Sequence, residues 1–181
     1  GSGDYSVVGN NIPWYNPLAD FMCEAIDKNV PIFGSCMGIQ VIANALGGEV
    51  ILDNKHREVG TYSITLNEEG HKDPLFSKLP KTFLAQMGHK CRVSVLPEDA
   101  VSLASSDLCP VHAFKLKGKM VYATQFHPEL NYHDNVKRLK YYYQNYHHAS
   151  QEESSEEMLM KFKEDDTNST LLSDFIMLVA G

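Results

Sequence analysis

The sequence predicts an α/β domain in which a mostly parallel sheet, with mixed strands at its edge, is flanked by helices. Two patterns support this fold class. In the first third of the chain helical and strand patterns alternate, which is typical of parallel sheets with helical connections. Further along, short strand patterns follow one another across tight turns, which favours hairpins. With 181 residues, 43% of them hydrophobic, the chain has the size and composition of one globular domain.

The early elements are a helix, a buried strand and a second helix. Apolar residues recur three and four positions apart over residues 17–29, which predicts an amphipathic helix. Residues 30–33 form an apolar run of the kind found in strands that are covered on both faces. Helical spacing returns over residues 39–46, and Gly47 and Gly48 then give a C-terminal glycine signal.

The later part of the chain combines strand candidates with two more helices. Apolar or alternating runs predict strands over residues 61–66, 82–86, 101–104, 111–116 and 120–125. Residues 117–119, with a central glycine, predict a hairpin turn between the last two strands. Helical spacing predicts helices over residues 134–147 and 171–179.

An acidic stretch separates these two helices. Residues 150–169 contain seven acids and two lysines, and so carry −5 of the chain's net charge of −7. We expect a solvated connector here, with a docking site for a basic partner as the alternative. Met158, Leu159 and Phe162 would give a short helix one apolar edge. The predicted organisation is one domain over residues 1–181, with an acidic insertion at about residues 150–169 before the last helix.

Charge, apolar runs and cysteine spacing exclude several classes of protein. No apolar run approaches the ~20 residues that cross a bilayer, and no signal peptide is visible. The net charge of −7 argues against a nucleic-acid partner. The four cysteines form no Cys-x-x-Cys pair, which argues against a zinc site and against a disulfide framework. The sequence favours a cytoplasmic protein with no membrane or nucleic-acid partner.

The strongest chemical signal is a cysteine between two glycines at the predicted strand–helix turn. Gly34-Ser35-Cys36-Met37-Gly38 has the Gly-x-nucleophile-x-Gly pattern of a nucleophile elbow, in which glycines relieve Cβ clashes. The helix N-terminus favours the Cys36 thiolate, and the N–H of Met37 can receive an oxyanion. The alternative is a buried structural cysteine. The other three cysteines lack glycine neighbours, and we expect them to serve packing.

His127 and Glu129 can supply the base and the orienting acid that a thiol nucleophile requires. They lie two residues apart at the end of the last strand candidate, and Pro128 between them favours extended backbone at His127. Residues two apart on an extended chain point the same way. A carboxylate beside an imidazole fixes its tautomer and supports its protonated form. We therefore predict that Cys36, His127 and Glu129 act together.

These motifs resemble the class I glutamine amidotransferase domain of the triad type. Residues 34–40 match Gly-x-Cys-x-Gly-x-Gln, residues 127–129 match His-Pro-Glu, and residues 46–48 are similar to the family's Leu-Gly-Gly. Residues 1–4 resemble its glycine-rich oxyanion loop. Within the family, the chain is most similar to stand-alone proteins that resemble the glutaminase half of GMP synthase, through residues 57–60, 73–76 and 104–106.

The resemblance implies a flavodoxin-like fold and a defined chemistry. Cys36 would attack the side-chain carbonyl of glutamine, His127 would transfer the proton, and Glu129 would orient His127. Glutamate and ammonia would form through a thioester, with no metal or organic cofactor. The substrate-binding positions that the resemblance and the elbow together assign are Gly1, Ser2, Gly3, Met37 and Gln40.

Two departures from the family pattern stand out. The family's His-Gly-Asp segment appears here as His89-Lys90-Cys91, which affects the substrate contacts expected near it. The family also begins with strands and a helix before the oxyanion loop, whereas this sequence starts at that loop. We therefore expect the chain to be a fragment that lacks the N-terminal strands.

Three functions are compatible with these residues. The first is a glutaminase that passes ammonia to a separate synthetase chain, because the sequence contains no Gly-x-x-x-x-Gly-Lys-Ser/Thr motif for ATP. The second is a γ-glutamyl peptidase or hydrolase that acts on γ-glutamyl peptides with the same triad. The third is a non-catalytic binding module. In the first two cases the ligand is glutamine or another small γ-glutamyl molecule.

Overall fold

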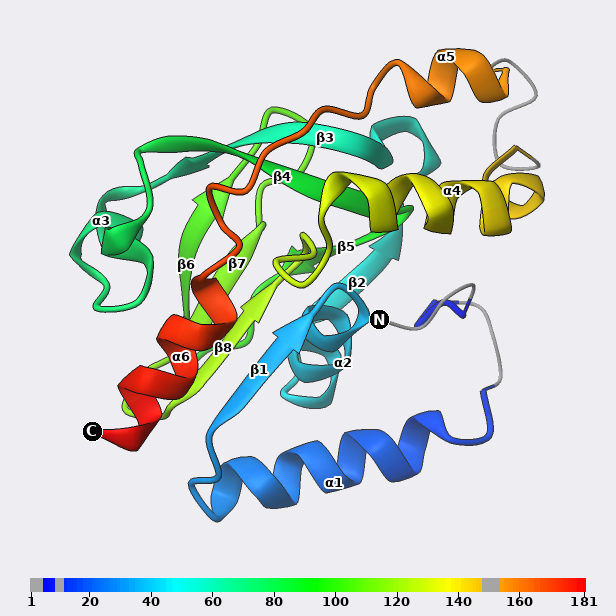
Figure 1. The fold of residues 1–181 in the computed structure, drawn as a ribbon. Coiled ribbons are helices and arrows are strands. Elements are labelled where there is room, and N and C mark those ends of the chain that lie inside the picture. Colours follow the sequence, from blue (N-terminus) through cyan, green and yellow to red (C-terminus); the bar gives the residue numbers. More distant parts are fainter. Residues whose placement is uncertain (1–4, 9–11, 148–153) are drawn as a thin grey trace.

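The computed structural model describes residues 5–8, 12–147 and 154–181. The helices are α1 (Tyr15–Asp27), α2 (Met37–Ala45), α3 (Glu68–Lys72), α4 (Tyr132–His147), α5 (Ser155–Leu159) and α6 (Leu171–Ala180) (Figure 1). The strands are β1 (Ile32–Ser35), β2 (Glu49–Leu52), β3 (Glu58–Leu66), β4 (Thr82–His89), β5 (Cys91–Val95), β6 (Ala100–Ser105), β7 (Ala113–Leu116) and β8 (Val121–Thr124). No helix in these ranges is both long and apolar enough to span a membrane.

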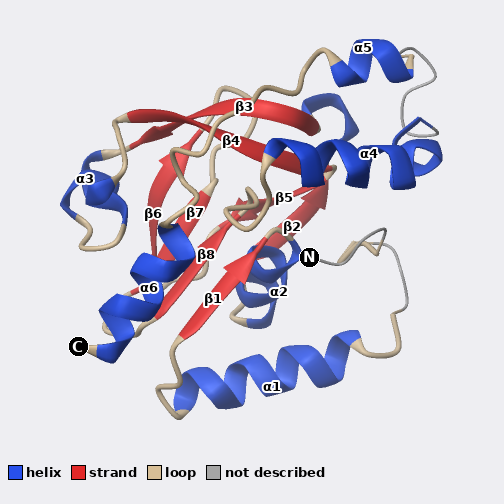
Figure 2. Cartoon of the chain, viewed as in Figure 1, coloured by secondary structure: helices blue, strands red, loops and turns tan. Residues whose placement is uncertain are grey.

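A six-stranded sheet has the order β1-β8-β7-β6-β3-β4, and β2 and β5 form a separate pair (Figure 2). The predicted α/β class, with helices flanking a mixed sheet, is confirmed. The parallel share is smaller than expected: in the described residues β1 and β8 pair in parallel, and the other pairs are antiparallel. Parallel neighbours need a crossover of about a dozen residues or more. Short loops join β6, β7 and β8, which leaves only antiparallel pairing.

The predicted elements are present, with shifted ends. The strand expected at residues 30–33 begins at Ile32 and continues to Ser35, because Val30 is still in the preceding turn and is 47% exposed. The hairpin at residues 117–119 is confirmed, since Gly118 has a φ of +67° between the antiparallel β7 and β8. The sequence patterns did not predict β2, β5, α3 or α5.

Two apolar cores cover opposite faces of the six-stranded sheet. Along β8, Tyr122 belongs to one core, and Val121 and Ala123 belong to the other, as the alternation of a strand requires. Helix α6 packs on the first core, and α1 and α2 pack on the second (Figure 1). In β1, Phe33 contacts the first core and Ile32 the second. The apolar run that suggested a strand covered on both faces thus has this physical cause.

The described part of the acidic stretch packs against the sheet, which corrects the expectation of a solvated connector. Met158 of α5 is fully buried and contacts a third cluster that includes Val59 and Leu139. The chain then runs beside β3 and β4, where the N–H of Thr61 donates to the carbonyl of Lys161 (2.9 Å). The acids face outward while the apolar edge is buried, so composition alone misjudged this segment. Residues 150–153 lie outside the described residues.

Candidate active site

Cys36 occupies a sharp turn between β1 and α2. Its backbone has φ 53° and ψ −98°, a strained region for a residue other than glycine. Its N–H donates to the carbonyl of Thr124 (2.8 Å), which ties the turn to the end of β8. A Cβ at Gly34 would lie 2.8 Å from Ile42 Cδ1 and 2.9 Å from the carbonyl carbon of Gly38. A Cβ at Gly38 would meet no described atom within 4 Å, so clash relief explains the first glycine only.

Parallel pairing brings His127 to the same edge of the sheet. β1 and β8 stay in register up to Ser35 opposite Thr124, so Cys36 and the segment after β8 leave the sheet together. The N–H of His127 donates to the carbonyl of Gln86 in β4 (3.0 Å), which fixes that segment. This is the carboxyl edge, where open α/β sheets bind their ligands.

His127 is oriented by a carboxylate and a hydroxyl. Its Nδ1 lies 2.7 Å from Glu129 Oε1, and the Ser35 hydroxyl donates to Glu129 Oε2 (2.8 Å). Burial opposes ionisation of Glu129, but the hydrogen bond and charge of His127 outweigh it and hold the pKa of Glu129 at about 2. His127 Nε2 is buried and makes no hydrogen bond to a described residue. This nitrogen is therefore the one available to the Cys36 thiol.

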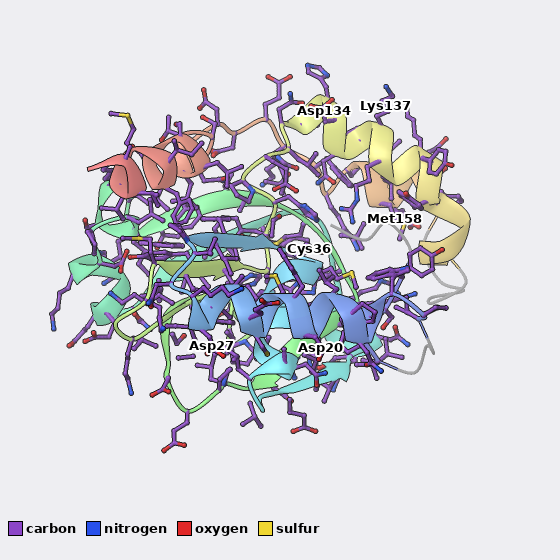
Figure 3. The ribbon with its side chains drawn as sticks, turned by 90° about the horizontal axis from the view of Figure 1, so that it is seen from below. Asp20, Asp27, Cys36, Asp134, Lys137 and Met158 are labelled. Carbon is purple, nitrogen blue, oxygen red and sulfur yellow. The ribbon has the colours of Figure 1, made fainter. Side chains whose placement is uncertain are left out.

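The Cys36 thiol and the His127 imidazole shift each other's pKa in opposite directions. Burial raises the pKa of Cys36, but the charge of nearby His127 outweighs burial, with smaller contributions from Arg138 and His89, and lowers it to about 6. Burial likewise disfavours charge on His127, but Cys36 and Glu129 raise its pKa to about 9. Between these values the pair is a thiolate and an imidazolium, the reactive state of a thiol nucleophile. Figure 3 shows Cys36 inside the molecule, between α1 and α4 in that view.

Two buried glutamine side chains surround the sulfur. Gln125 Nε2 donates to Cys36 Sγ (3.8 Å). Gln40 Nε2 donates both to Gln125 Oε1 (3.3 Å) and to the carbonyl of Cys91 (2.9 Å). The predicted substrate residue Gln40 therefore lies near the nucleophile, and its amide nitrogen is held by protein atoms.

The remaining predicted residues fall in different places. Met37 is the first residue of α2, directly after the nucleophile, and is buried. Gly1, Ser2 and Gly3 lie outside the described residues. Burial raises the pKa of Cys91, and it raises the pKa of Cys109 to about 12, so both behave as the packing residues that the sequence predicted.

Sequence patterns missed three side chains at this site. Ser35 supports Glu129, Gln125 touches the sulfur, and Arg138 of α4 contributes a charge that lowers the pKa of Cys36. Gln125 lies two residues before His127 at the end of a strand, and that spacing was an available signal. Arg138 donates to the carbonyl of Gly88 (3.2 Å) from a separate helix, and no local pattern indicates this contact.

Known proteins match this chain in sequence. One of the two subunits of glutamine-hydrolysing GMP synthase, from Methanocaldococcus jannaschii, is 41% identical over 106 residues, which are 59% of this chain and 54% of that protein. The glutamine-hydrolysing GMP synthase of Thermosipho melanesiensis is 37% identical over 119 residues, 65% of this chain and 22% of that protein. The chain thus spans about half the length of the GMP synthase subunits that it matches.

Solved structures and a family model complete the comparison. A glutamine amidotransferase from Thermotoga maritima has the same fold, with a TM-score of 0.78 at 19% identity over 96% of this chain and 74% of that one. A glutamine amidotransferase from Methylobacillus flagellatus gives a TM-score of 0.69 at 23% identity over 97% of this chain and 71% of that one. The model of the family "Glutamine amidotransferase class-I" matches residues 9–149. The chain therefore belongs to the class-I glutamine amidotransferase family.

Proposed function

We propose that this chain hydrolyses the γ-glutamyl amide of glutamine to glutamate and ammonia, with Cys36, His127 and Glu129 as its catalytic triad. The observation that carries the proposal is the buried Cys36 thiol on a strained elbow, whose pKa is held at about 6 by His127 against the effect of burial. A thiolate at neutral pH, next to a histidine–carboxylate pair, is equipped for acyl transfer.

The proposed reaction has two halves. The Cys36 thiolate attacks the side-chain carbonyl carbon of glutamine, and the resulting oxyanion collapses as the carbon–nitrogen bond breaks. The His127 imidazolium gives its proton to the leaving ammonia, which leaves a γ-glutamyl thioester on Cys36. His127 then takes a proton from water as the water attacks the thioester. Glutamate leaves, and the thiolate–imidazolium pair is restored.

The substrate contacts are assigned to residues beside the elbow. The N–H of Met37 at the start of α2, together with the Gly1–Gly3 loop, would hold the oxyanion. Gln40 would line the glutamine site. Because its amide nitrogen is held by Gln125 and Cys91, we assign the substrate contact to its amide oxygen.

We further propose that the ammonia is consumed by a separate synthetase chain. The relatives of this chain include proteins named as one lettered subunit of a glutamine-hydrolysing GMP synthase, and such a name indicates a second subunit. The four cysteines are free thiols, and a reducing cytoplasm would preserve Cys36 in that form. The reaction as written needs neither a metal nor an organic cofactor.

A substrate comparison tests the proposal. Glutamate release from glutamine and from glutathione would be measured for the wild-type chain, for Cys36→Ala and for the matched control Cys109→Ala. We expect glutamine to be the better substrate, Cys36→Ala to be inactive and Cys109→Ala to keep most of the activity. Preference for glutathione would indicate a γ-glutamyl peptidase instead. Binding of glutamine without turnover by the wild-type chain would indicate a non-catalytic module.

A further inference from the structure

A second group of buried titratable side chains lies around Glu58, at the start of β3. Glu58 is fully buried, and its Oε2 lies 2.9 Å from Nε2 of both His89 and His112. The Ser106 hydroxyl donates to its Oε1 (2.8 Å). A buried carboxylate is costly unless it is paired and hydrogen-bonded. The proposed reaction does not use this group, and the sequence motif at residues 57–60 has no role so far.

The hydrogen bonds define the charge of this group. Burial opposes ionisation of Glu58, but hydrogen bonds from His112 and His89 outweigh it and hold its pKa well below the ordinary range. His89 Nε2 faces this carboxylate, and His89 Nδ1 faces the carbonyl of Cys91 (3.2 Å). Both partners are acceptors, so both ring nitrogens must donate, and His89 is an imidazolium. Burial lowers the pKa of His112, so the group reduces to one carboxylate–imidazolium pair.

This pair is connected to the nucleophile by a continuous chain of buried polar contacts. The Cys91 carbonyl that accepts from His89 also accepts from Gln40 Nε2 (2.9 Å). Gln40 donates in addition to Gln125, which donates to Cys36 Sγ. The charge of His89 also contributes to lowering the pKa of Cys36. Whatever holds His89 therefore holds the wall of the site.

The same residues are of the types that bind zinc. Single ligand atoms of Glu58, His89, Cys109 and His112 lie within 4.8 Å of one another. The contacts favour a hydrogen-bonded network, because both histidine Nε2 atoms already donate to Glu58. Cys109 Sγ donates to the carbonyl of Val111 (3.4 Å), and its pKa of about 12, raised by burial, keeps it a thiol. Thiolate, by contrast, is the form that ligates metals.

We propose that Glu58 is a positioning residue for the Cys36 reaction: its carboxylate holds His89 as an imidazolium, and His89 fixes the Cys91 carbonyl that orients Gln40. This gives a role to the glutamate of residues 57–60. It also explains how the site is built where the family's His-Gly-Asp segment reads His89-Lys90-Cys91. The inference rests on the proposed function for its effect on turnover, but the effect on the Cys36 thiol does not depend on substrate.

The test compares Glu58→Gln with a matched control, Asp73→Asn, in the full chain. Asp73 is also a buried carboxylate, 1% exposed, and pairs with Lys115 (2.7 Å) and with the Tyr122 hydroxyl (3.1 Å), outside the chain of contacts that reaches Cys36. Readouts are glutamine turnover, the pH profile of Cys36 alkylation by iodoacetamide, the melting temperature, and the zinc content of the purified wild-type protein.

We expect Glu58→Gln to lower kcat by about 10²-fold, the scale of a small misplacement of reacting groups. It should also raise the pH midpoint of Cys36 alkylation, because the His89 charge that favours the thiolate is lost. Asp73→Asn should lower the melting temperature without changing either readout. His89→Gln should repeat the Glu58→Gln pattern, and it decides the question if Glu58→Gln does not fold.

Three results would overturn the inference. In the first, Glu58→Gln and Asp73→Asn change stability alike and leave the Cys36 profile unchanged. In the second, His89→Gln keeps the wild-type turnover and profile. In the third, the wild-type protein contains stoichiometric zinc, which would make Glu58 a metal ligand. If the wild-type protein does not hydrolyse glutamine but the alkylation profile shifts as expected, the proposed function fails and the positioning role stands.

Discussion

Replacing His127 by asparagine should raise the pH at which Cys36 becomes a thiolate. With a pKa of about 6, Cys36 is about nine-tenths thiolate at pH 7, whereas a thiol with the ordinary value of 9.0 is about one-hundredth ionised. The difference corresponds to about 4 kcal/mol in favour of the thiolate. In the variant, burial raises the pKa, and only Arg138 and His89 oppose it, so we expect the midpoint to return to 9.0 or above.

Iodoacetamide alkylation as a function of pH measures this midpoint, with mass spectrometry of peptides separating Cys36 from the other thiols. The loss of rate at pH 7 should be small. About 90-fold less thiolate is offset about 20-fold by the greater nucleophilicity of a more basic thiolate, which leaves about fourfold. The midpoint, rather than the rate at one pH, is therefore decisive. Cys109, fully buried with a pKa of about 12, should stay unmodified in both proteins. A wild-type midpoint near 9.0, or equal midpoints in the two proteins, would refute the reasoning.

Three further substitutions have defined outcomes. His127→Ala should lower kcat about 10²-fold more than Glu129→Ala, because the histidine transfers protons and the acid orients it; equal losses in a glutaminase assay would count against these roles. Met158→Ala should lower the free energy of unfolding in urea by about 2–5 kcal/mol, since Met158 is fully buried, whereas Met160→Ala, 74% exposed, should stay within about 0.5 kcal/mol. Gly34→Ala should destabilise by about 1–3 kcal/mol in a thermal melt, because its Cβ would meet α2 atoms at 2.8 and 2.9 Å, and an unchanged melt would contradict this.

The sequence could predict the chemical residues because each motif is local. A strand that turns directly into a helix, with Cys36 at the turn, is written in five consecutive residues. His127 and Glu129 share a face through their spacing alone. What joins the two motifs is the parallel pairing of β1 with β8, with Ser35 opposite Thr124. Local patterns do not contain that pairing, so sequence could name the triad but not its geometry.

The parts that sequence could not predict depend on contacts between distant segments. Glu58 and His89 lie on the paired strands β3 and β4, and His112 lies in the loop before β7. Each of them alone looks like an ordinary polar residue. The acidic segment has the composition of a solvated connector, and Met158 is buried only because Val59 and Leu139 form its partner surface. β2 and β5 are short strands with mixed residue patterns, and each is stabilised by the other.

The most direct test of the proposed triad chemistry is to trap the covalent intermediate. Wild-type protein would be mixed with glutamine, quenched in acid during turnover, digested and analysed by mass spectrometry. We predict that the peptide containing Cys36 gains the mass of one γ-glutamyl group, that the Cys109 peptide does not, and that Cys36→Ala protein forms neither the adduct nor glutamate. Turnover that leaves Cys36 unmodified, together with glutamate formation by the Cys36→Ala protein, would contradict it.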